Sequence, residues 1–321
     1  MESKREPILE VKHLSISFTQ YTQRTKRRTL QTIRDLSLQV LPGQVVAVVG
    51  ASGSGKSLLA HGILGILPYN SRMEGEVFYE GKPLTARRIE ELRGREITLV
   101  PQGVTYLDPL MKVGPQLWRG KKDPAVQKRF REALERYGLG PEIEDRYPFE
   151  LSGGMARRVL IASAVAEGPR LVIADEPTPG LDEGTARRIL GHFREMADDG
   201  AGVLLITHDL RMALSAADRI AVFYQGETIE EAGPEDFKDV ERLKHPFTKA
   251  LWHAMPEHGF GVEENDGFSS GEPNILLSGK KEAARIGTCG SDHPARGESG
   301  LKGAQRPGED NALRSEEHTS E

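Results

Sequence analysis

The chain has 321 residues, of which 37% are hydrophobic and 28% charged, the balance of a soluble globular protein. A net charge of −5 and a pI of about 6.1 argue against a nucleic-acid-binding protein, because such proteins carry a basic field. No apolar stretch approaches the roughly 20 residues that span a bilayer, and the N-terminus lacks the apolar segment of a signal peptide. The single cysteine, Cys289, excludes an internal disulfide, so we expect a cytosolic protein that can still dock on a membrane protein.

The first part of the chain predicts strands. Apolar residues alternate over residues 8–18 and again over residues 36–40, as they do in half-buried strands. The basic run Thr25–Arg28 between them predicts an exposed hairpin turn. A Pro-Gly pair at 42–43 then turns the chain into the apolar, β-branched run at 45–49, which is typical of a buried parallel strand.

A glycine-rich loop follows this strand. Residues 50–57 read GASGSGKS and match the P-loop pattern G-x-x-x-x-G-K-[ST]. The glycines let backbone N–H groups turn inward around an anion, the lysine adds charge for terminal phosphates, and the serine hydroxyl can ligate Mg²⁺. Apolar residues then recur at helical spacing from Leu58 to Leu67, and a helix N-terminus also favours anions. We predict a polyphosphate site, rather than a chance glycine-rich turn, at Gly50, Ala51, Ser52, Gly53, Ser54, Gly55, Lys56 and Ser57.

The rest of the chain alternates between strands and helices. Short apolar runs at 97–100, 171–174 and 203–207 predict buried strands. This alternation predicts an α/β fold with a mainly parallel sheet. A helix between the last two strands is predicted by an apolar stripe at helical spacing, formed by Leu181, Ile189, Leu190, Phe193 and Met196.

Two carboxylates follow the strand at 171–174. In LVIADE, Asp175 lies where a carboxylate can hold the Mg²⁺ shell. Glu176 lies one step further on, where it can polarise a water in line with the γ-phosphate. The alternative is a solvated strand end, but a P-loop in the same chain favours a catalytic Glu176 beside a metal-binding Asp175.

A second candidate anion site lies at LSGGM, residues 151–155, before a helix that we expect to end near residue 166. Backbone N–H groups at a helix N-terminus bind anions, although the serine can also be a plain N-cap. At this point the chain resembles the ATP-binding cassette (ABC) family, whose signature LSGGQ closes over ATP bound to the opposite subunit; here Met155 replaces the glutamine. The nucleotide-binding residues expected in this segment are Ser152, Gly153 and Gly154.

The resemblance implies roles for further residues. Gln102 matches the Q-loop glutamine that senses Mg²⁺ and the attacking water, and His208, in LLITHDL, matches the switch histidine that contacts the γ-phosphate. Asp182, in PGLD, matches the D-loop near the dimer seam; Phe18 matches the aromatic that stacks on adenine, with Tyr21 as the alternative. A lone strand-end Gln or His is usually structural, but the family order of the motifs favours these roles. The implied ligands are ATP and Mg²⁺, with the metal held by Ser57, Gln102 and Asp175.

The resemblance also implies the ABC ATPase fold, in which a mainly parallel core sheet is joined by an antiparallel β subdomain and an inserted helical subdomain. Residues 106–117 (YLDPLMKVGPQL) and 245–256 (HPFTKALWHAMP) resemble the peptide/nickel importer branch. The LSGGM signature resembles that of the first of two non-identical ATPase subunits, and the sequence around the P-loop resembles that of nickel or opine-metallophore importers. Many members of this branch end in a four-cysteine iron–sulfur segment, which a chain with one cysteine cannot form. The expected permease-docking residues are Asp108, Leu110 and Met111; the alternative is a plain loop.

The sequence predicts one patterned domain over residues 8–256, with residues 103–165 as the helical subdomain and a helix over Pro124–Tyr137. Residues 257–321 are rich in Gly, Glu, Lys and Ser and predict a disordered tail. The last eight residues, 314–321 (RSEEHTSE), resemble the translation of a common sequencing adapter; the alternative is an ordinary polar tail.

The predicted function is that of the ATP-hydrolysing subunit of an importer for nickel–metallophore complexes or oligopeptides. The implied partners are a second ATPase subunit, two transmembrane permease subunits and, indirectly, an extracytoplasmic solute-binding protein, with no nucleic acid. The implied location is peripheral, on the cytoplasmic face of the inner membrane. A soluble ABC ATPase, such as an accessory protein of phosphonate breakdown, is the alternative. The intact Lys56, Asp175, Glu176 and His208 disfavour a non-hydrolysing binding module.

Overall fold

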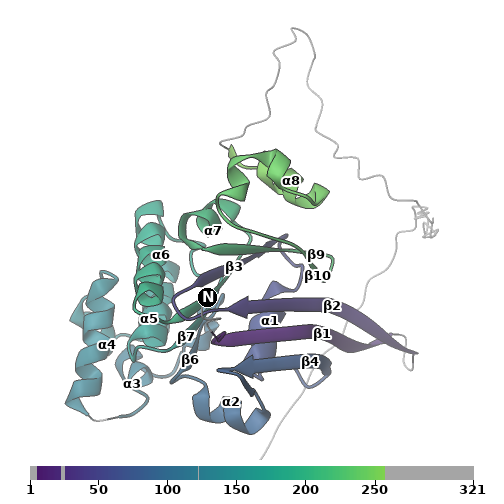
Figure 1. Cartoon of the computed structure of the whole chain (residues 1–321). Coiled ribbons are helices and arrows are strands. Elements are labelled where there is room, and N and C mark those ends of the chain that lie inside the picture. Colours follow the sequence, from purple (N-terminus) through teal and green to yellow (C-terminus); the bar gives the residue numbers. More distant parts are fainter. Residues whose placement is uncertain (1–5, 23–25, 122, 257–321) are drawn as a thin grey trace, which may run out of the picture. The chain divides into compact units, whose positions relative to one another are not determined.

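The computed structural model describes residues 6–22, 26–121 and 123–256 (Figure 1). None of the helices described there is long and apolar enough to cross a membrane. The strands are β1 (Leu9–Thr22), β2 (Lys26–Val40), β3 (Val45–Gly50), β4 (Ser71–Tyr79), β5 (Lys82–Pro83), β6 (Ile97–Val100), β7 (Leu171–Asp175), β8 (Gly202–Thr207), β9 (Arg219–Tyr224) and β10 (Glu227–Ala232). The α-helices are α1 (Lys56–Ile63), α2 (Ala86–Leu92), α3 (Val113–Leu117), α4 (Pro124–Arg136), α5 (Gly153–Val165), α6 (Glu183–Asp198), α7 (Leu210–Ala216) and α8 (Pro246–His253).

In this part of the chain the strands form one sheet in the order β5-β4-β1-β2-β10-β9-β3-β8-β7-β6. The strands from β9 to β6 all pair in parallel. The strands β5, β4, β1 and β2 pair antiparallel, and β10 joins the two halves, antiparallel to β9 and parallel to β2. The predicted α/β fold with a mainly parallel core sheet is confirmed.

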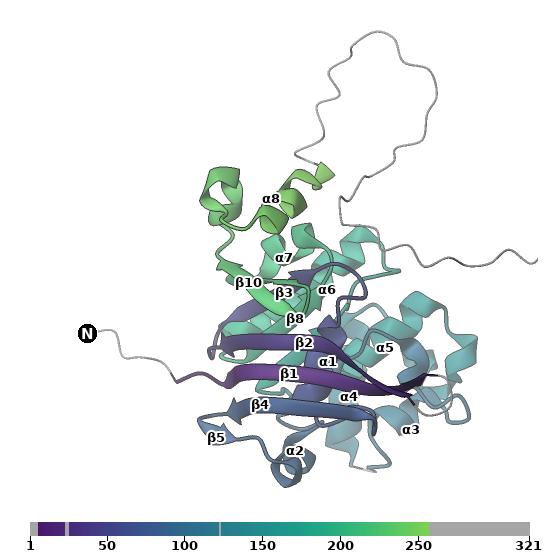
Figure 2. The same cartoon turned by 90° about the vertical axis from the view of Figure 1, so that its right-hand side faces the viewer.

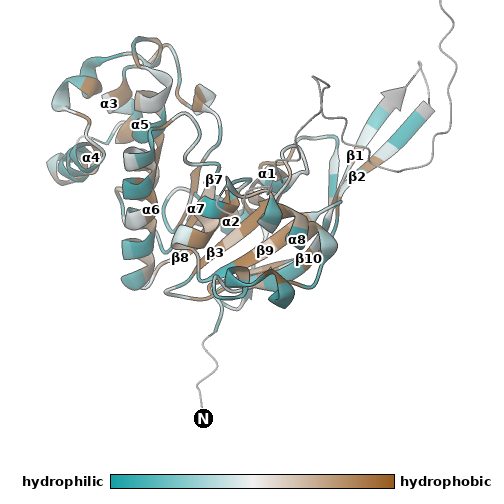
Figure 3. Ribbon diagram, turned by 90° about the horizontal axis from the view of Figure 1, so that it is seen from above, coloured by the Kyte–Doolittle hydropathy of each residue, from teal (hydrophilic) through white to brown (hydrophobic). Residues whose placement is uncertain are grey.

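The buried strands pack on both faces. Every residue of β3, β7 and β8 is buried, which explains their almost continuous apolar sequences. Along β3, Val45, Ala47 and Val49 join the core beneath α5 and α6, while Val46 and Val48 join the core around α1. Figure 2 shows β1, β2 and β4 side by side with α1 behind them, and Figure 3 shows apolar β3, β8 and β9 between the helices.

The helices α3 and α4 lie on the opposite side of the molecule from the tip of the β1–β2 hairpin (Figures 1 and 3). The Asp123 side chain caps α4 by accepting a hydrogen bond of 2.9 Å from the Ala125 N–H, and Pro124 occupies its first turn. Phe130 and Leu134 of α4 are buried in the core that α5 shares. The predicted helix is therefore present, while the boundaries 8–256 and 103–165 stay predictions.

The structure corrects three details of the prediction. Lys26–Arg28 lie in β2 rather than in a turn, because the pairing of β1 with β2 continues to the hairpin tip. The helix α1 ends at Ile63, where Gly65, at φ 64°, turns the chain. Leu181 lies before α6, whose N-cap is Asp182. The expected tail over residues 257–321 lies outside the described residues.

Candidate functional site

The parallel strands bring the predicted residues to one edge of the sheet. β3 leads into the loop 50–57, β6 leads to Gln102, β7 ends at Asp175, and β8 leads to His208. These four strands are neighbours in the order β3-β8-β7-β6. Ligand sites of parallel sheets lie outside the carboxyl ends of the strands, so this edge is the candidate site.

The loop 50–57 has the backbone of an anion-binding turn. Gly53 and Gly55 have φ values of 74° and 95°, which favour glycine, and a Cβ on Gly55 would lie 2.4 Å from Thr32 of β2. The buried Lys56 Nζ donates to the carbonyl oxygens of Gly50 and Ala51, each at 2.8 Å. Burial lowers the pKa of Lys56, and the charges of Glu176 and Asp175 oppose that shift. The ammonium is thus held over the loop, where phosphate oxygens can replace its carbonyl partners.

Ser57 and Asp175 form a pair of oxygen ligands. The Ser57 hydroxyl donates to Asp175 Oδ1 at 3.1 Å across the gap between α1 and β7. Asp175 is only 3% exposed, and burial raises its pKa while the Ser57 hydrogen bond lowers it. Among the described residues no cluster of three or more His, Cys, Asp or Glu can hold a metal. The hydroxyl and carboxylate oxygens of Ser57 and Asp175 fit Mg²⁺, which takes hard oxygens and completes its shell with water and phosphate.

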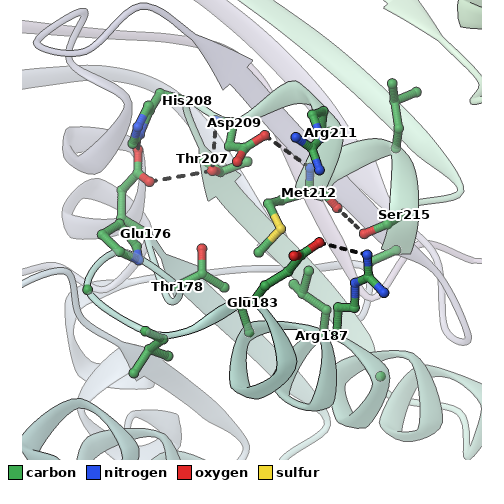
Figure 4. Close-up of a pocket in the computed structure, with 18 of the residues that line it drawn as sticks. Glu176, Thr178, Glu183, Arg187, Thr207, His208, Asp209, Arg211, Met212 and Ser215 are labelled. Carbon is green, nitrogen blue, oxygen red and sulfur yellow. Dashed lines mark hydrogen bonds and ion pairs between the residues drawn. The ribbon is translucent and has the colours of Figure 1, made fainter. Parts of the chain in front are cut away.

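Glu176 and His208 contact each other directly (Figure 4). The Glu176 Oε1 lies 2.8 Å from His208 Nδ1, and the Thr207 hydroxyl donates to Glu176 Oε2 at 3.4 Å. Glu176 is buried, whereas 53% of the His208 side chain is exposed. A buried carboxylate beside an exposed imidazole can hold an attacking water between protein and phosphate.

Gln102 is exposed, and in the described part of the chain no hydrogen bond joins its side chain to Ser57 or Asp175. Its backbone carbonyl instead accepts a hydrogen bond of 2.7 Å from Arg157 of α5. Neither Arg157 nor Thr207 was expected in the site. A single sequence carries no signal that a helical arginine bonds to distant carbonyls, whereas a hydroxyl one position before the histidine could have been noticed.

The LSGGM and D-loop residues lie at helix ends. The Ser152 side chain caps α5 by accepting from the Met155 N–H at 3.2 Å, so the plain N-cap role is present. Asp182 caps α6 by accepting from the Thr185 N–H at 2.9 Å, and hydrogen bonds from the Thr185 hydroxyl, the larger cause, and from that N–H hold the pKa of Asp182 below the usual range. A Cβ on Gly153 would meet no atom within 4 Å, whereas one on Gly154 would touch Leu181 at 3.5 Å. The signature thus lies open beside the D-loop, and the hydrogen bonds of Ser152 stay within α5 in the described chain.

Phe18 lies on β1 between Leu30 of β2 and Ser71 of β4, partly buried against the core around α1. The side chain of Tyr21, the alternative, lies outside the described ones. Thr32 of the neighbouring β2 reaches Gly55. The hairpin therefore borders the loop, and Phe18 stays the predicted adenine contact.

A cleft of about 970 Å³ opens beside Glu176 and His208 (Figure 4). Its walls come from the D-loop, α6 and α7, and no residue of the loop 50–57 lines it. Two arginines that line the cleft are paired with carboxylates: Arg187 donates a hydrogen bond to Glu183, and Arg194 donates one to Asp218, each at 2.7 Å. The backbone of the loop 50–57, with Gly53 and Gly55 at positive φ, suits phosphates better than this cleft does.

Comparisons with known proteins agree with this arrangement. The ABC transporter family model matches residues 33–179. The oligopeptide transport ATP-binding protein OppD of Bacillus subtilis is 37% identical over 86% of this chain and 80% of its own length. The dipeptide transport ATP-binding protein DppD of Lactococcus lactis is 33% identical over 87% of this chain and 82% of its own length. The chain belongs to the ABC transporter family.

It is an ATP-hydrolysing member of that family. A solved dimeric ATP-binding cassette, in a post-hydrolysis state with ADP and phosphate, superposes with a TM-score of 0.61 at 26% identity. The match covers 70% of this chain and 98% of that one. The expected ABC ATPase fold and ATP binding are therefore confirmed, while the roles of individual residues rest on the geometry above.

Proposed function

We propose that this ABC ATPase energises an importer for oligopeptides or nickel–metallophore complexes, working with separate permease subunits on the cytoplasmic face of the membrane. The main support for ATP hydrolysis is structural. Lys56, the Ser57–Asp175 pair and the Glu176–His208 pair lie next to one another along one edge of the sheet. The peptide-transport relatives, similar over most of this chain, support a transport role and peptides as the substrate class.

In the proposed reaction each residue has one task. Lys56 holds terminal phosphate oxygens above the loop, and Glu176 accepts the proton of the attacking water. His208, held by Glu176 at 2.8 Å, orients that water against the phosphate. Ser57, Asp175 and Gln102 would hold Mg²⁺, which supplies charge neutralisation on the phosphates.

A second ATPase chain completes the proposed site. The open Gly153 of LSGGM and the largely exposed D-loop leave the N-terminus of α5 facing solvent, where a nucleotide held by another subunit can approach. The solved dimeric cassette supports this arrangement. Two chains meeting head to tail would then build two composite sites, with Ser152, Gly153, Gly154 and Asp182 serving the opposite nucleotide.

The proposed permease contact is the loop that contains Asp108, Leu110 and Met111. Leu110 is 88% exposed and Met111 is 44% exposed, an unusual position for large apolar side chains. The loop is nevertheless ordered, because Gln116 donates to the carbonyls of Asp108 and Met111 at 3.0 and 2.6 Å. A rigid apolar projection next to the Q-loop suits a coupling contact with a membrane subunit.

The test is uptake by cells that lack the chromosomal copy of the chain and carry a plasmid copy. We expect the wild-type copy to restore uptake of either a labelled tripeptide or radioactive nickel supplied with a metallophore. A Leu110→Ser, Met111→Ser copy should lose that uptake, while the purified variant assembled with its partner ATPase subunit hydrolyses ATP within about twofold of the wild-type assembly. Asp108 is left intact, because its side chain accepts the Leu110 N–H at 2.9 Å and shapes the loop.

If neither uptake depends on the chain, the importer role is wrong, and a soluble ABC ATPase becomes the better account. If uptake depends on the chain but survives in the double variant, only the docking surface is wrong.

A further inference from the structure

Arg157 joins two segments of the catalytic edge. From the second turn of α5, its Nη1 donates to the backbone carbonyl of Glu176 at 2.6 Å, and its Nη2 donates to that of Gln102 at 2.7 Å. We propose that Arg157 is a positioning residue for hydrolysis, which fixes the Glu176 carboxylate relative to the Q-loop. This inference rests on the proposed role of Glu176 as the base.

Glu176 is a residue whose backbone needs such support. Its φ of 47° lies in the left-handed region, which a residue with a Cβ adopts only when its surroundings hold it there. Its N–H donates to the Ile206 carbonyl of β8 at 2.8 Å, and its carboxylate lies 2.8 Å from His208. Arg157 holds the remaining backbone group, the carbonyl. Without that bond the following peptide is free to rotate, and the carboxylate can move away from the water.

An arginine side chain suits the bridging role proposed for Arg157. A guanidinium presents two Nη donors in one plane, so a single side chain can bridge two carbonyls at a fixed separation. A lysine ammonium is a single point charge and can replace only part of this bridge. The hydrogen bond to the Glu176 carbonyl places the guanidinium close to the acidic end of β7, where burial lowers the pKa of Arg157 and the charge of Glu176 opposes that shift.

The bridge also connects the signature to the base. The N-cap of α5 is Ser152, so Arg157 belongs to the same short helix as the LSGGM segment. A displacement of that helix end therefore acts on Glu176 and Gln102 through one side chain. Because a misplacement of about 1 Å can cost on the order of 100-fold in rate, a nucleotide contact at the signature can control hydrolysis in this way.

A purely structural role is the competing explanation, and a matched arginine separates the two. Arg88 of α2 is also partly buried, and its Nη1 donates to two backbone carbonyls, those of Tyr79 at 2.9 Å and Lys82 at 2.7 Å. It lies in the antiparallel half of the fold, away from the four strand ends of the site. Arg88→Met therefore measures what the loss of such a bridge costs in stability alone.

The experiment measures kcat, KM for ATP and Tm for the full chain, assembled with its partner subunits, as wild type, Arg157→Met, Arg157→Lys, Arg88→Met and Glu176→Gln. For Arg157→Met we expect kcat to fall about 10- to 100-fold while KM for ATP changes by less than about threefold. The lysine variant should lie between wild type and Arg157→Met. Arg88→Met should lower Tm but keep kcat within about twofold.

The inference is overturned if Arg157→Met keeps kcat within twofold of wild type, or if both methionine variants lose kcat in proportion to their loss of Tm. If Arg157→Met does not fold, the lysine variant decides, since wild-type kcat in that variant also overturns the inference. The Glu176→Gln variant separates the two claims. Turnover in Glu176→Gln would refute the proposed base, whereas an inactive Glu176→Gln beside an active Arg157→Met would refute the positioning role alone.

Discussion

When ionised, the Glu176 carboxylate accepts hydrogen bonds and donates none. In the structure both of its oxygens face donors. His208 lies at 2.8 Å from Oε1 and the Thr207 hydroxyl at 3.4 Å from Oε2. A glutamine amide has the same shape without the negative charge: its oxygen can accept from His208, and its NH₂ can donate to the Thr207 hydroxyl, which can also accept. The Glu176→Gln change is therefore a test of proton acceptance rather than of folding.

We expect Glu176→Gln to lower kcat for ATP hydrolysis by about 10²–10⁴-fold, because it removes a positioned base. Binding of a fluorescent ATP analogue should stay within about threefold of wild type. In Lys56→Ala, the comparison variant, nucleotide binding itself should weaken, since the charge held over Gly50 and Ala51 is lost. Turnover of Glu176→Gln within a few-fold of wild type, after correction for any partner subunit, would refute the assignment.

The candidate side chains near strand ends were predictable from the sequence, because each of them follows an apolar strand in a family motif. Lys56, Asp175 and His208 each come after one of the predicted strands, and the structure brings the three to one edge of the sheet. Arg157 was not predictable in this way, because its partners are backbone carbonyls that lie 55 and 19 positions away in the chain. Every residue has a backbone carbonyl, so no residue type in the sequence predicts such a contact.

Among the elements, the contact of α4 with α6 joins the expected helical subdomain to the core. The Tyr137 hydroxyl hydrogen-bonds to Nδ1 of His192, and Arg136 forms an ion pair with Glu195 beside it. Burial lowers the pKa of His192 to about 4, with the charge of Arg136 acting in the same direction and that of Glu195 opposing it. The imidazole is therefore neutral in the folded chain at pH 7.

This contact predicts a pH dependence of stability. The ordinary pKa of histidine is about 6.5, so between pH 6.5 and pH 4 the unfolded chain binds a proton at His192 that the folded chain does not. The free energy of unfolding then falls as the pH falls through this window. After allowance for partial exposure, the loss at pH 5 is about 1 kcal/mol, or about 2–4 °C in Tm.

The measurement is Tm at pH 7 and pH 5 for wild type, His192→Gln and His253→Gln, the last an exposed histidine on α8. The loss of Tm on acidification should be smaller in His192→Gln than in the other two chains. An equal loss in all three would show that His192 does not titrate as the structure indicates.

The core elements were predictable because their patterns are strong. The apolar runs of β3, β6, β7 and β8 differ from the predicted strands by at most one residue at either end. Other elements gave weak local signals. β10 (ETIEEA) lies between the two halves of the sheet, and its side chains are exposed or only partly buried, which permits a mostly polar sequence. Its pairing with β9 and β2, rather than an apolar pattern, makes it a strand. The polar tip of β2 was likewise mistaken for a turn, because strand pairing rather than burial defines it.

For the whole molecule, the decisive property is that one chain supplies half of each proposed site. The phosphate loop and Glu176 lie at the strand ends of the core, whereas Ser152 begins α5 and keeps its hydrogen bonds within that helix in the described chain. The open surface of Gly153 leaves room for a nucleotide held by another subunit. Activity should therefore depend on assembly and not only on folding.

The most direct test of this account is ATP turnover as a function of assembly. The full chain is assayed at concentrations where light scattering shows it to be monomeric, and again with the ATPase subunit with which it copurifies. The account predicts little turnover by the monomer and an increase of at least about tenfold in the assembly, which Ser152→Ala in the active assembly should reduce. Robust turnover by a strictly monomeric sample, unchanged by the partner, would contradict it.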